Sequence, residues 1–201
     1  MLEFVRGTHF NGRRNGLAVA TILISALFAG CTTVMPPPMA GGQSAKALRA
    51  AQLAPAQVGN FKLAPGKPAA MDTEIGGGLR GGNIAAPSGS FSRHLKETLR
   101  AELQSAGLLD PQSKLLIEGQ LTDSQVDAAI GTGTARLAAR FQVTSEGKVL
   151  FDKEVAAEDS WDSSFVGAIA IPRAIEHYGG IYRLLVDKLL GDADFVKALK
   201  R

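Results

Sequence analysis

The sequence has few of the side chains that build reactive or metal-binding centres. Its 201 residues include one cysteine and three histidines, and aromatic residues make up 6% of the chain. A single cysteine cannot form an internal disulfide, and neither His94 nor His177 has a second histidine or a cysteine at metal-ligand spacing. The sequence therefore predicts no disulfide framework, no metal site and no cofactor.

A strong charge imbalance is also lacking. The formal net charge is +3, and Arg6, Arg13 and Arg14 lie at the very start of the chain. A basic excess points to nucleic acid or to an anionic surface only when it belongs to the folded body. Because most of this excess precedes residue 16, we expect no nucleic-acid partner.

No hydrophobic run near the N-terminus is long enough for a comfortable membrane span. The uncharged stretch GLAVATILISALFAG covers residues 16–30, whereas a spanning helix needs about 20 apolar residues. Basic residues, a short apolar stretch and small residues at its end are typical of a secretory signal peptide. We therefore expect residues 1–30 to be a signal peptide and the remainder to be exported.

The single cysteine, Cys31, directly follows this apolar stretch. The segment LFAGC resembles the lipobox of bacterial lipoproteins, with Phe28 at a position where leucine is usual. That resemblance implies a cysteine alkylated with diacylglycerol, which becomes the new N-terminus and carries fatty acyl chains such as palmitate. Thr32, rather than aspartate, follows the cysteine, and in such lipoproteins this implies sorting to the outer membrane. The alternative is an ordinary buried cysteine at the end of an uncleaved signal anchor.

Two segments lack a regular pattern. Residues 31–56 begin with small residues and the run Pro36–Pro38, which favours an extended polyproline conformation, so we predict a lipid-anchored flexible tether. Residues 75–90 are rich in glycine but lack the spacing of a phosphate-binding loop, so we predict a mobile loop.

The remaining pattern, over residues 57–201, predicts an α+β domain. A weak strand at 57–65 precedes an amphipathic helix that Ser90 can cap and Gly107 can end. Alternating strands follow at 114–122, 135–144 and 149–158, and a second long helix covers about 171–190. We therefore predict a two-layer sandwich, with two long helices on one face of a mainly antiparallel four-stranded sheet.

Two groups of residues are candidates for partner binding, and none is predicted to be catalytic. Arg136 and Arg140 would lie on the polar, uncovered face of the sheet. Trp161 lies in the acidic segment EDSWDSSF, residues 158–165, which we read as an exposed loop that either packs against the sheet edge or recognises a partner. Neither a G-x-S-x-G motif nor a complete set of nucleophile, base and acid is evident.

The segments FSRHLKETLRAELQSAGL, GKVLFDKEV and YRLLVDKLLGDADFVKAL resemble YajG-type envelope lipoproteins and the auxiliary lipoproteins of ABC-type lipid transporters. They are more distantly similar to the N-terminal domain of TolB-like proteins. The resemblance implies a non-enzymatic accessory or binding component of the cell envelope, with an envelope protein, lipid or peptidoglycan as partner. The alternatives are an envelope hydrolase or acyltransferase acting on a sugar or lipid precursor, and a cytosolic membrane-anchored adaptor.

Overall fold

The structure is a computed structural model, and it describes residues 32–38, 48–49, 52–76 and 78–200. The predicted signal peptide and Cys31 lie outside these residues. Within the described part of the chain, no helix is both long and apolar enough to cross a bilayer. The elements, in chain order, are β1 (Thr32–Val34), β2 (Gln57–Leu63), α3 (Ala70–Thr73), β3 (Glu74–Ile75), β4 (Asn83–Ala85), α4 (Phe91–Ala106), β5 (Leu115–Asp127), β6 (Gly131–Ser145), β7 (Lys148–Ser163), α5 (Gly167–Leu190) and α6 (Ala193–Ala198).

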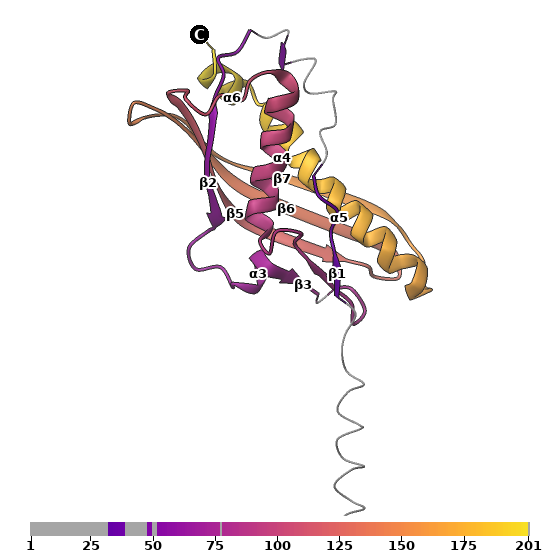
Figure 1. The fold of residues 1–201 in the computed structure, drawn as a ribbon. Coiled ribbons are helices and arrows are strands. Elements are labelled where there is room, and N and C mark those ends of the chain that lie inside the picture. Colours follow the sequence, from indigo (N-terminus) through magenta and orange to yellow (C-terminus); the bar gives the residue numbers. More distant parts are fainter. Residues whose placement is uncertain (1–31, 39–47, 50–51, 77, 201) are drawn as a thin grey trace, which may run out of the picture. The chain divides into compact units, whose positions relative to one another are not determined.

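The predicted α+β sandwich is confirmed. The main sheet has the strand order β2-β5-β6-β7, in which β2 runs parallel to β5 and the other pairs are antiparallel. The helices α4 and α5 both lie against one face of this sheet (Figure 1). A β-bulge follows Leu121 in β5, where Asp123 pairs with Ala138. The extra residue keeps Ser124 and Val126 on the helix side and places Asp123 on the opposite face.

Helix α4 begins and ends where its sequence predicts. The Ser90 side chain accepts a hydrogen bond from the backbone N–H of Arg93 at 3.1 Å, which satisfies one of the free donors of the first turn. Gly107 ends the helix with φ of 73°, a left-handed conformation that glycine adopts without steric cost. The apolar stripe is fully buried against the sheet, through Phe91, Leu95, Leu99 and Leu103.

Helix α5 begins at Gly167, one turn earlier than predicted, and Pro172 therefore lies inside it. A buried polar chain joins this helix to the sheet. The Tyr178 and Ser124 hydroxyls are 2.7 Å apart, and the Tyr178 and Tyr182 hydroxyls are 2.9 Å apart. Burial raises the pKa of both tyrosines well above the ordinary value, so both hydroxyls stay protonated and available for these bonds.

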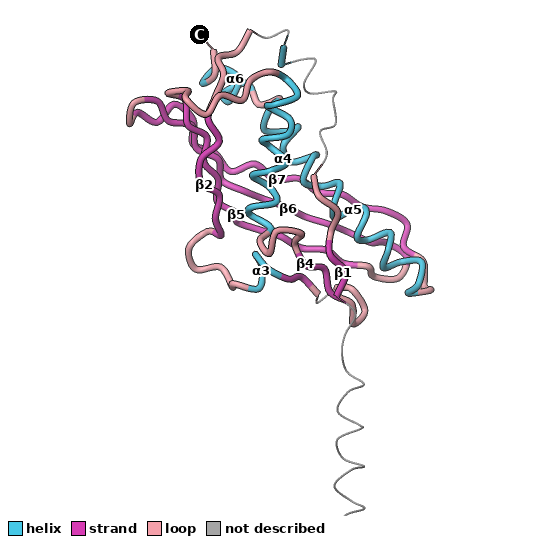
Figure 2. Tube along the Cα trace, viewed as in Figure 1, coloured by secondary structure: helices cyan, strands magenta, loops and turns pink. Residues whose placement is uncertain are grey.

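A small second sheet, in the order β1-β4-β3, forms from segments that were expected to be irregular. Within the glycine-rich stretch 75–90, which was predicted to be a mobile loop, Leu79 and Ile84 are fully buried. Residues 32–38 fall within the predicted tether. In the structure, Thr32 to Val34 pair in parallel with Asn83 to Ala85, so β1 lies beside β4 (Figure 2). Met35, which follows β1, is buried.

The acidic segment 158–165 was expected to be a loop, and that prediction is wrong for most of it. Strand β7 continues to Ser163 and stays paired with β6 as far as Gly131. Alternation persists through the segment, with Ala157, Trp161 and Ser163 buried and Glu158 and Asp162 exposed. Glu158, Ser160 and Asp162 occupy the outward positions of the strand, so their polarity reflects the solvent-facing side of the sheet.

Candidate functional site

The face of the main sheet opposite α4 and α5, which we call the open face, carries the polar residues of β2, β5, β6 and β7. Both arginines that the sequence analysis selected lie on it. Because side chains alternate along a strand, Arg136, Ala138 and Arg140 point the same way from β6. Ala138 is nevertheless buried, since it lies between the two longer arginine side chains.

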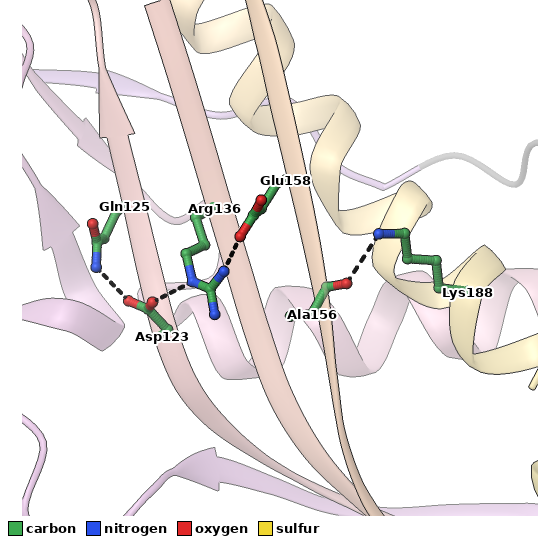
Figure 3. A network of polar contacts seen from close by, with 6 residues as sticks. All are labelled: Asp123, Gln125, Arg136, Ala156, Glu158 and Lys188. Atoms are coloured by element: carbon green, nitrogen blue, oxygen red, sulfur yellow. Dashed lines mark hydrogen bonds and ion pairs between the residues drawn. The ribbon is translucent and has the colours of Figure 1, made fainter.

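Arg136 lies at the centre of an ion-pair network across three strands (Figure 3). Its Nε donates to Asp123 Oδ2 at 2.9 Å, and its Nη1 donates to Glu158 Oε1. Gln125 Nε2 donates to the other oxygen of Asp123 at 2.8 Å. The hydrogen bond to Asp123 is the main cause that raises the pKa of Arg136, so this guanidinium stays charged and is held in place.

Arg140 makes a second, two-pronged contact further along the same strand. Its Nε and Nη2 donate to the two oxygens of Asp152, at 2.5 and 2.9 Å, and Gln142 Nε2 donates to Oδ2 at 3.1 Å. The hydrogen bond from Arg140 lowers the pKa of Asp152. Parallel donation of this kind fixes the guanidinium plane.

Two hollows accompany these pairs. One, of about 880 Å³, lies beside Arg136, and a smaller one, of about 310 Å³, lies beside Arg140. Besides Arg136, the larger hollow is lined by polar residues of three strands and by the segment that precedes β4, including Gln125, Asp127, Thr134, Glu158, Ser160, Ile75 and Gly78. The smaller is lined, besides Arg140, by Asn60, Lys62, Glu118, Gln120, Gln142 and Asp152.

Acidic groups outnumber basic groups on the open face. The strand register places on it the acidic residues Glu118, Asp123, Asp127, Asp152, Glu154, Glu158 and Asp162, and the basic residues Lys62, Arg136 and Arg140. Both arginines are already paired, while Glu154 and Asp162 are exposed. The face therefore offers negative charge and hydrogen-bonding groups to an incoming surface.

Trp161, the third predicted partner-binding residue, faces the helix layer. It is 6% exposed and lies directly over Gly133, where even a Cβ would come within 2.3 Å of the indole. On its other side it stacks on His177, with ring centroids 4.3 Å apart and planes 9° from parallel. The structure does not bring Trp161 together with the two arginines, because positions 161 and 136 project from opposite faces of the sheet.

His177 forms an acid–histidine pair that the sequence analysis missed. Its Nδ1 lies 2.7 Å from Asp159 Oδ2, and Asp159 also lines the 880 Å³ hollow. The two residues are 18 positions apart, so only the packing of α5 against β7 could have indicated the contact. Among the described residues, Asp159 is the one hydrogen-bond partner of the His177 side chain.

Asp123, Glu158 and Asp152 were also missed as parts of the site. Each lies on a strand next to an arginine, and antiparallel register places Arg136 opposite Glu158 and Gln142 opposite Asp152. Alternation alone could have placed Glu158 and Asp152 on the open face. The position of Asp123 depends on the bulge after Leu121, which the sequence does not signal.

Cys31, the predicted lipidation site, lies outside the described residues, but its neighbour Thr32 begins β1. The Thr32 hydroxyl contacts Glu74 Oε1 at 3.5 Å, and Asn83 Nδ2 donates to the same oxygen at 2.5 Å. The described chain therefore joins the folded body within one residue of Cys31.

No protein-family model matches the chain, and no curated protein matches it in sequence. A crystal structure of a Xanthomonas campestris protein from the DUF330 family is similar, with a TM-score of 0.56 at 10% identity, over 83% of this chain and 96% of that chain. A candidate lipoprotein from Caulobacter crescentus gives a TM-score of 0.42 at 11% identity, over 77% and 93%. A minor lipoprotein from Acinetobacter baumannii gives 0.38 at 12% identity, over 71% and 89%. At this level of identity, the likeness to the DUF330 protein shows a shared fold and no activity.

Proposed function

We propose that this chain is a lipoprotein of the bacterial outer membrane, anchored through Cys31, whose body faces the periplasm and binds an envelope partner without catalysing a reaction. The N-terminal pattern supports the anchor: basic residues, the apolar stretch 16–30, and small residues directly before a single cysteine. Two or more acyl chains hold a protein stably on a bilayer, so the body is free to bind a partner.

The intact mass of the mature protein tests the anchor. We expect the mature chain to begin at Cys31 and to carry the mass of a diacylglycerol group. A Cys31→Ser variant should remain unprocessed or leave the membrane. An unmodified chain beginning at Met1 would contradict the anchor and would favour the cytosolic adaptor.

The acidic open face is the observation that carries the binding proposal. Seven acidic residues and three basic residues point away from the helices, and both arginines are neutralised by their neighbours. Such a surface repels lipid phosphates and carboxylate-rich polymers and attracts positively charged protein surfaces. Among the envelope partners that the sequence analysis considered, this charge favours a protein over lipid or peptidoglycan. Resemblance to ABC-transport auxiliary lipoproteins makes a membrane transport complex the first partner to test.

Photo-crosslinking in the envelope tests the face directly. A photoreactive residue at Thr134, which is exposed on the open face, should give one defined protein adduct. The same residue at Arg183, exposed on α5, should not give that adduct. Charge reversal by Glu154→Lys with Asp162→Lys should reduce the adduct by at least about tenfold, because like charges that meet at an interface cost several kcal/mol.

The matched control is Glu176→Lys, a charge reversal at an exposed position of α5. It changes the net charge in the same direction but leaves the open face intact, so the adduct should persist. An adduct that survives the reversal on β7 as well as the one on α5 would show that the open face is not the binding surface.

One observation favours the enzyme alternative, and it has its own test. The Asp159–His177 pair, which meets on the helix side of the sheet, is an arrangement in which an acid can orient a general base. A hydrolase using this pair should lose about 10²- to 10⁴-fold in rate on His177→Gln while its far-ultraviolet circular dichroism stays unchanged. A panel of ester and glycoside substrates assayed on the purified lipoprotein would show whether any such activity exists.

A further inference from the structure

One end of the body carries an exposed apolar cluster made by two neighbouring turns. The turn between β5 and β6, residues 128–130, contributes Ile130. The turn between β7 and α5, which we take together with the first three residues of that helix as residues 164–169, contributes Phe165, Val166 and Ile169. Ile130 is 71% exposed, Phe165 78% and Ile169 58%. Neither turn contains a charged residue. Large apolar side chains grouped in this way mark a surface that contacts another apolar phase.

A single arginine holds the two turns together. Arg80 Nε donates to the Ala128 carbonyl at 2.8 Å, Nη1 to the Phe165 carbonyl at 3.0 Å, and Nη2 to the Ser164 carbonyl at 2.8 Å. Backbone groups that enter an apolar phase must have partners within the protein. Arg80 supplies those partners, so the turns present apolar side chains while three of their carbonyls remain satisfied.

The start of β1 lies at this same end of the body. Thr32 pairs with Asn83, which follows Arg80 by three residues, and a Cβ on Gly82 would lie 3.8 Å from Ile171 in the second turn of α5. Figure 1 shows the first residue of β1, the beginning of α5 and the β5–β6 turn at one end of the fold. Cys31 is joined to Thr32 by one peptide unit, about 3.8 Å between Cα atoms.

We infer that the turns 128–130 and 164–169 form a second membrane contact, and that their apolar side chains insert into the leaflet that holds the Cys31 acyl chains. This inference rests on the proposed anchor at Cys31. A lipid attached one residue before the folded body leaves no spacer between body and bilayer, so this end of the body must meet the lipid surface. The partner of this apolar cluster is therefore the membrane itself.

The single cysteine of the chain makes the contact measurable. Alkylation with diacylglycerol consumes the thiol of Cys31, so Phe165→Cys adds the only reactive thiol of the mature lipoprotein, and an environment-sensitive dye can be attached there. The matched control is Val149→Cys, 50% exposed at the start of β7 and next to the β6–β7 turn. That turn lies at the opposite end of β6, which spans 15 residues, or roughly 45–50 Å at about 3.3 Å per residue.

The labelled lipoproteins are reconstituted in vesicles of phosphatidylethanolamine and phosphatidylglycerol that contain a lipid with a spin-label quencher. We expect the dye at position 165 to shift its emission to the blue, to brighten severalfold and to be quenched by the lipid. The dye at 149 should emit as in water. Adding Ile130→Ser and Ile169→Ser should return the dye at 165 toward aqueous emission. A dye at 130, introduced by Ile130→Cys, should repeat the result for 165.

The experiment distinguishes an error in the proposed anchor from an error in the proposed second contact. If the unsubstituted mature protein reacts with the dye, Cys31 carries a free thiol and the proposed anchor is wrong. If that protein does not react and the dyes at 165 and 130 emit as in water, the anchor stands and the second contact is overturned. Equal quenching at 149 and 165 would also overturn it, because the contact would then not belong to one end of the body.

Discussion

His94 shows how folding can hold one side chain in its uncharged form. The residue is 3% exposed in α4, its ring meets the edge of Tyr182 at 4.7 Å, and its Nδ1 has no hydrogen-bond partner among the described residues. Burial lowers the pKa of His94 to about 4, because protonation would create a cation that neither water nor a charged partner stabilises. The histidine is therefore held in the core as a packing residue.

The lowered pKa of His94 predicts that stability falls as the pH drops. Between the unfolded value of 6.5 and the folded value of about 4, the unfolded chain binds a proton that the folded chain excludes. The free energy of unfolding should therefore fall by about 2 kcal/mol between pH 7 and pH 5. His94→Gln removes the titrating group and should flatten this slope. Urea unfolding at both pH values measures the difference.

Other titrating groups give a different pH window. The pKa values of Asp152 and Asp192 are lowered by Arg140 and Lys153 respectively, so these carboxylates add stability that is lost mainly below their ordinary pKa, near pH 4. Measurements above pH 5 therefore isolate the histidine. If His94→Gln unfolds with the same pH slope as the unsubstituted protein, exclusion of the proton from His94 is not the cause of that slope.

At the scale of elements, what the sequence predicted depended on how local the signal was. Helix α4 was predicted almost to the residue, because its cap, its apolar stripe and its terminal glycine all lie within 90–107. Strand β6 was recognised from strict alternation. Strand β7 was predicted too short, because the outward acidic residues after Glu158 resemble a loop. The small sheet β1-β4-β3 was missed, since its short strands pair segments about 50 positions apart.

Replacing a glycine by alanine should have opposite effects on stability at one position in a strand and at one position in a helix. A Cβ on Gly119 of β5 would lie 2.4 Å from the ring of Phe61, a buried residue that packs edge-on against Phe141. A Cβ on Gly180 of α5 would meet nothing within 4 Å. Gly119→Ala should therefore destabilise the fold by about 1–3 kcal/mol, whereas Gly180→Ala should stabilise it by about 0.5–1 kcal/mol. Thermal unfolding of both variants, with melting temperatures moving in opposite directions, checks the pair.

The two substitutions also test an expectation about α5 itself. Two adjacent glycines inside a helix, here Gly179 and Gly180, predict a kink or a close approach to the sheet. The helix is continuous from Gly167 to Leu190, and no atom crowds either position. If Gly180→Ala lowered the melting temperature as much as Gly119→Ala, α5 would need the backbone freedom of glycine at this point, contrary to its packing here.

At the scale of the whole molecule, the N-terminal segment decides how the body would meet the membrane under the proposed anchor. The sequence suggests a tether, because three consecutive prolines and small residues carry no periodic signal. The structure places Met35 in the core at 1% exposed, with its N–H donating to the Ala85 carbonyl at 3.1 Å. Pro36 to Pro38 then line a hollow of about 400 Å³ between α4 and α5. Only tertiary packing against β4 and the helices could reveal this position.

Met35→Ala therefore distinguishes a docked segment from a free tether. If residues 32–38 are part of the folded body, truncating this buried side chain should lower the free energy of unfolding by about 2–5 kcal/mol. Val34→Ala, at a position 60% exposed on the same strand, should change it by no more than about 0.5 kcal/mol. Denaturant unfolding of the mature lipoprotein in detergent measures both values. A free tether would leave both variants as stable as the parent protein. The body would then stand away from the bilayer, and the turns 128–130 and 164–169 could not reach the lipid.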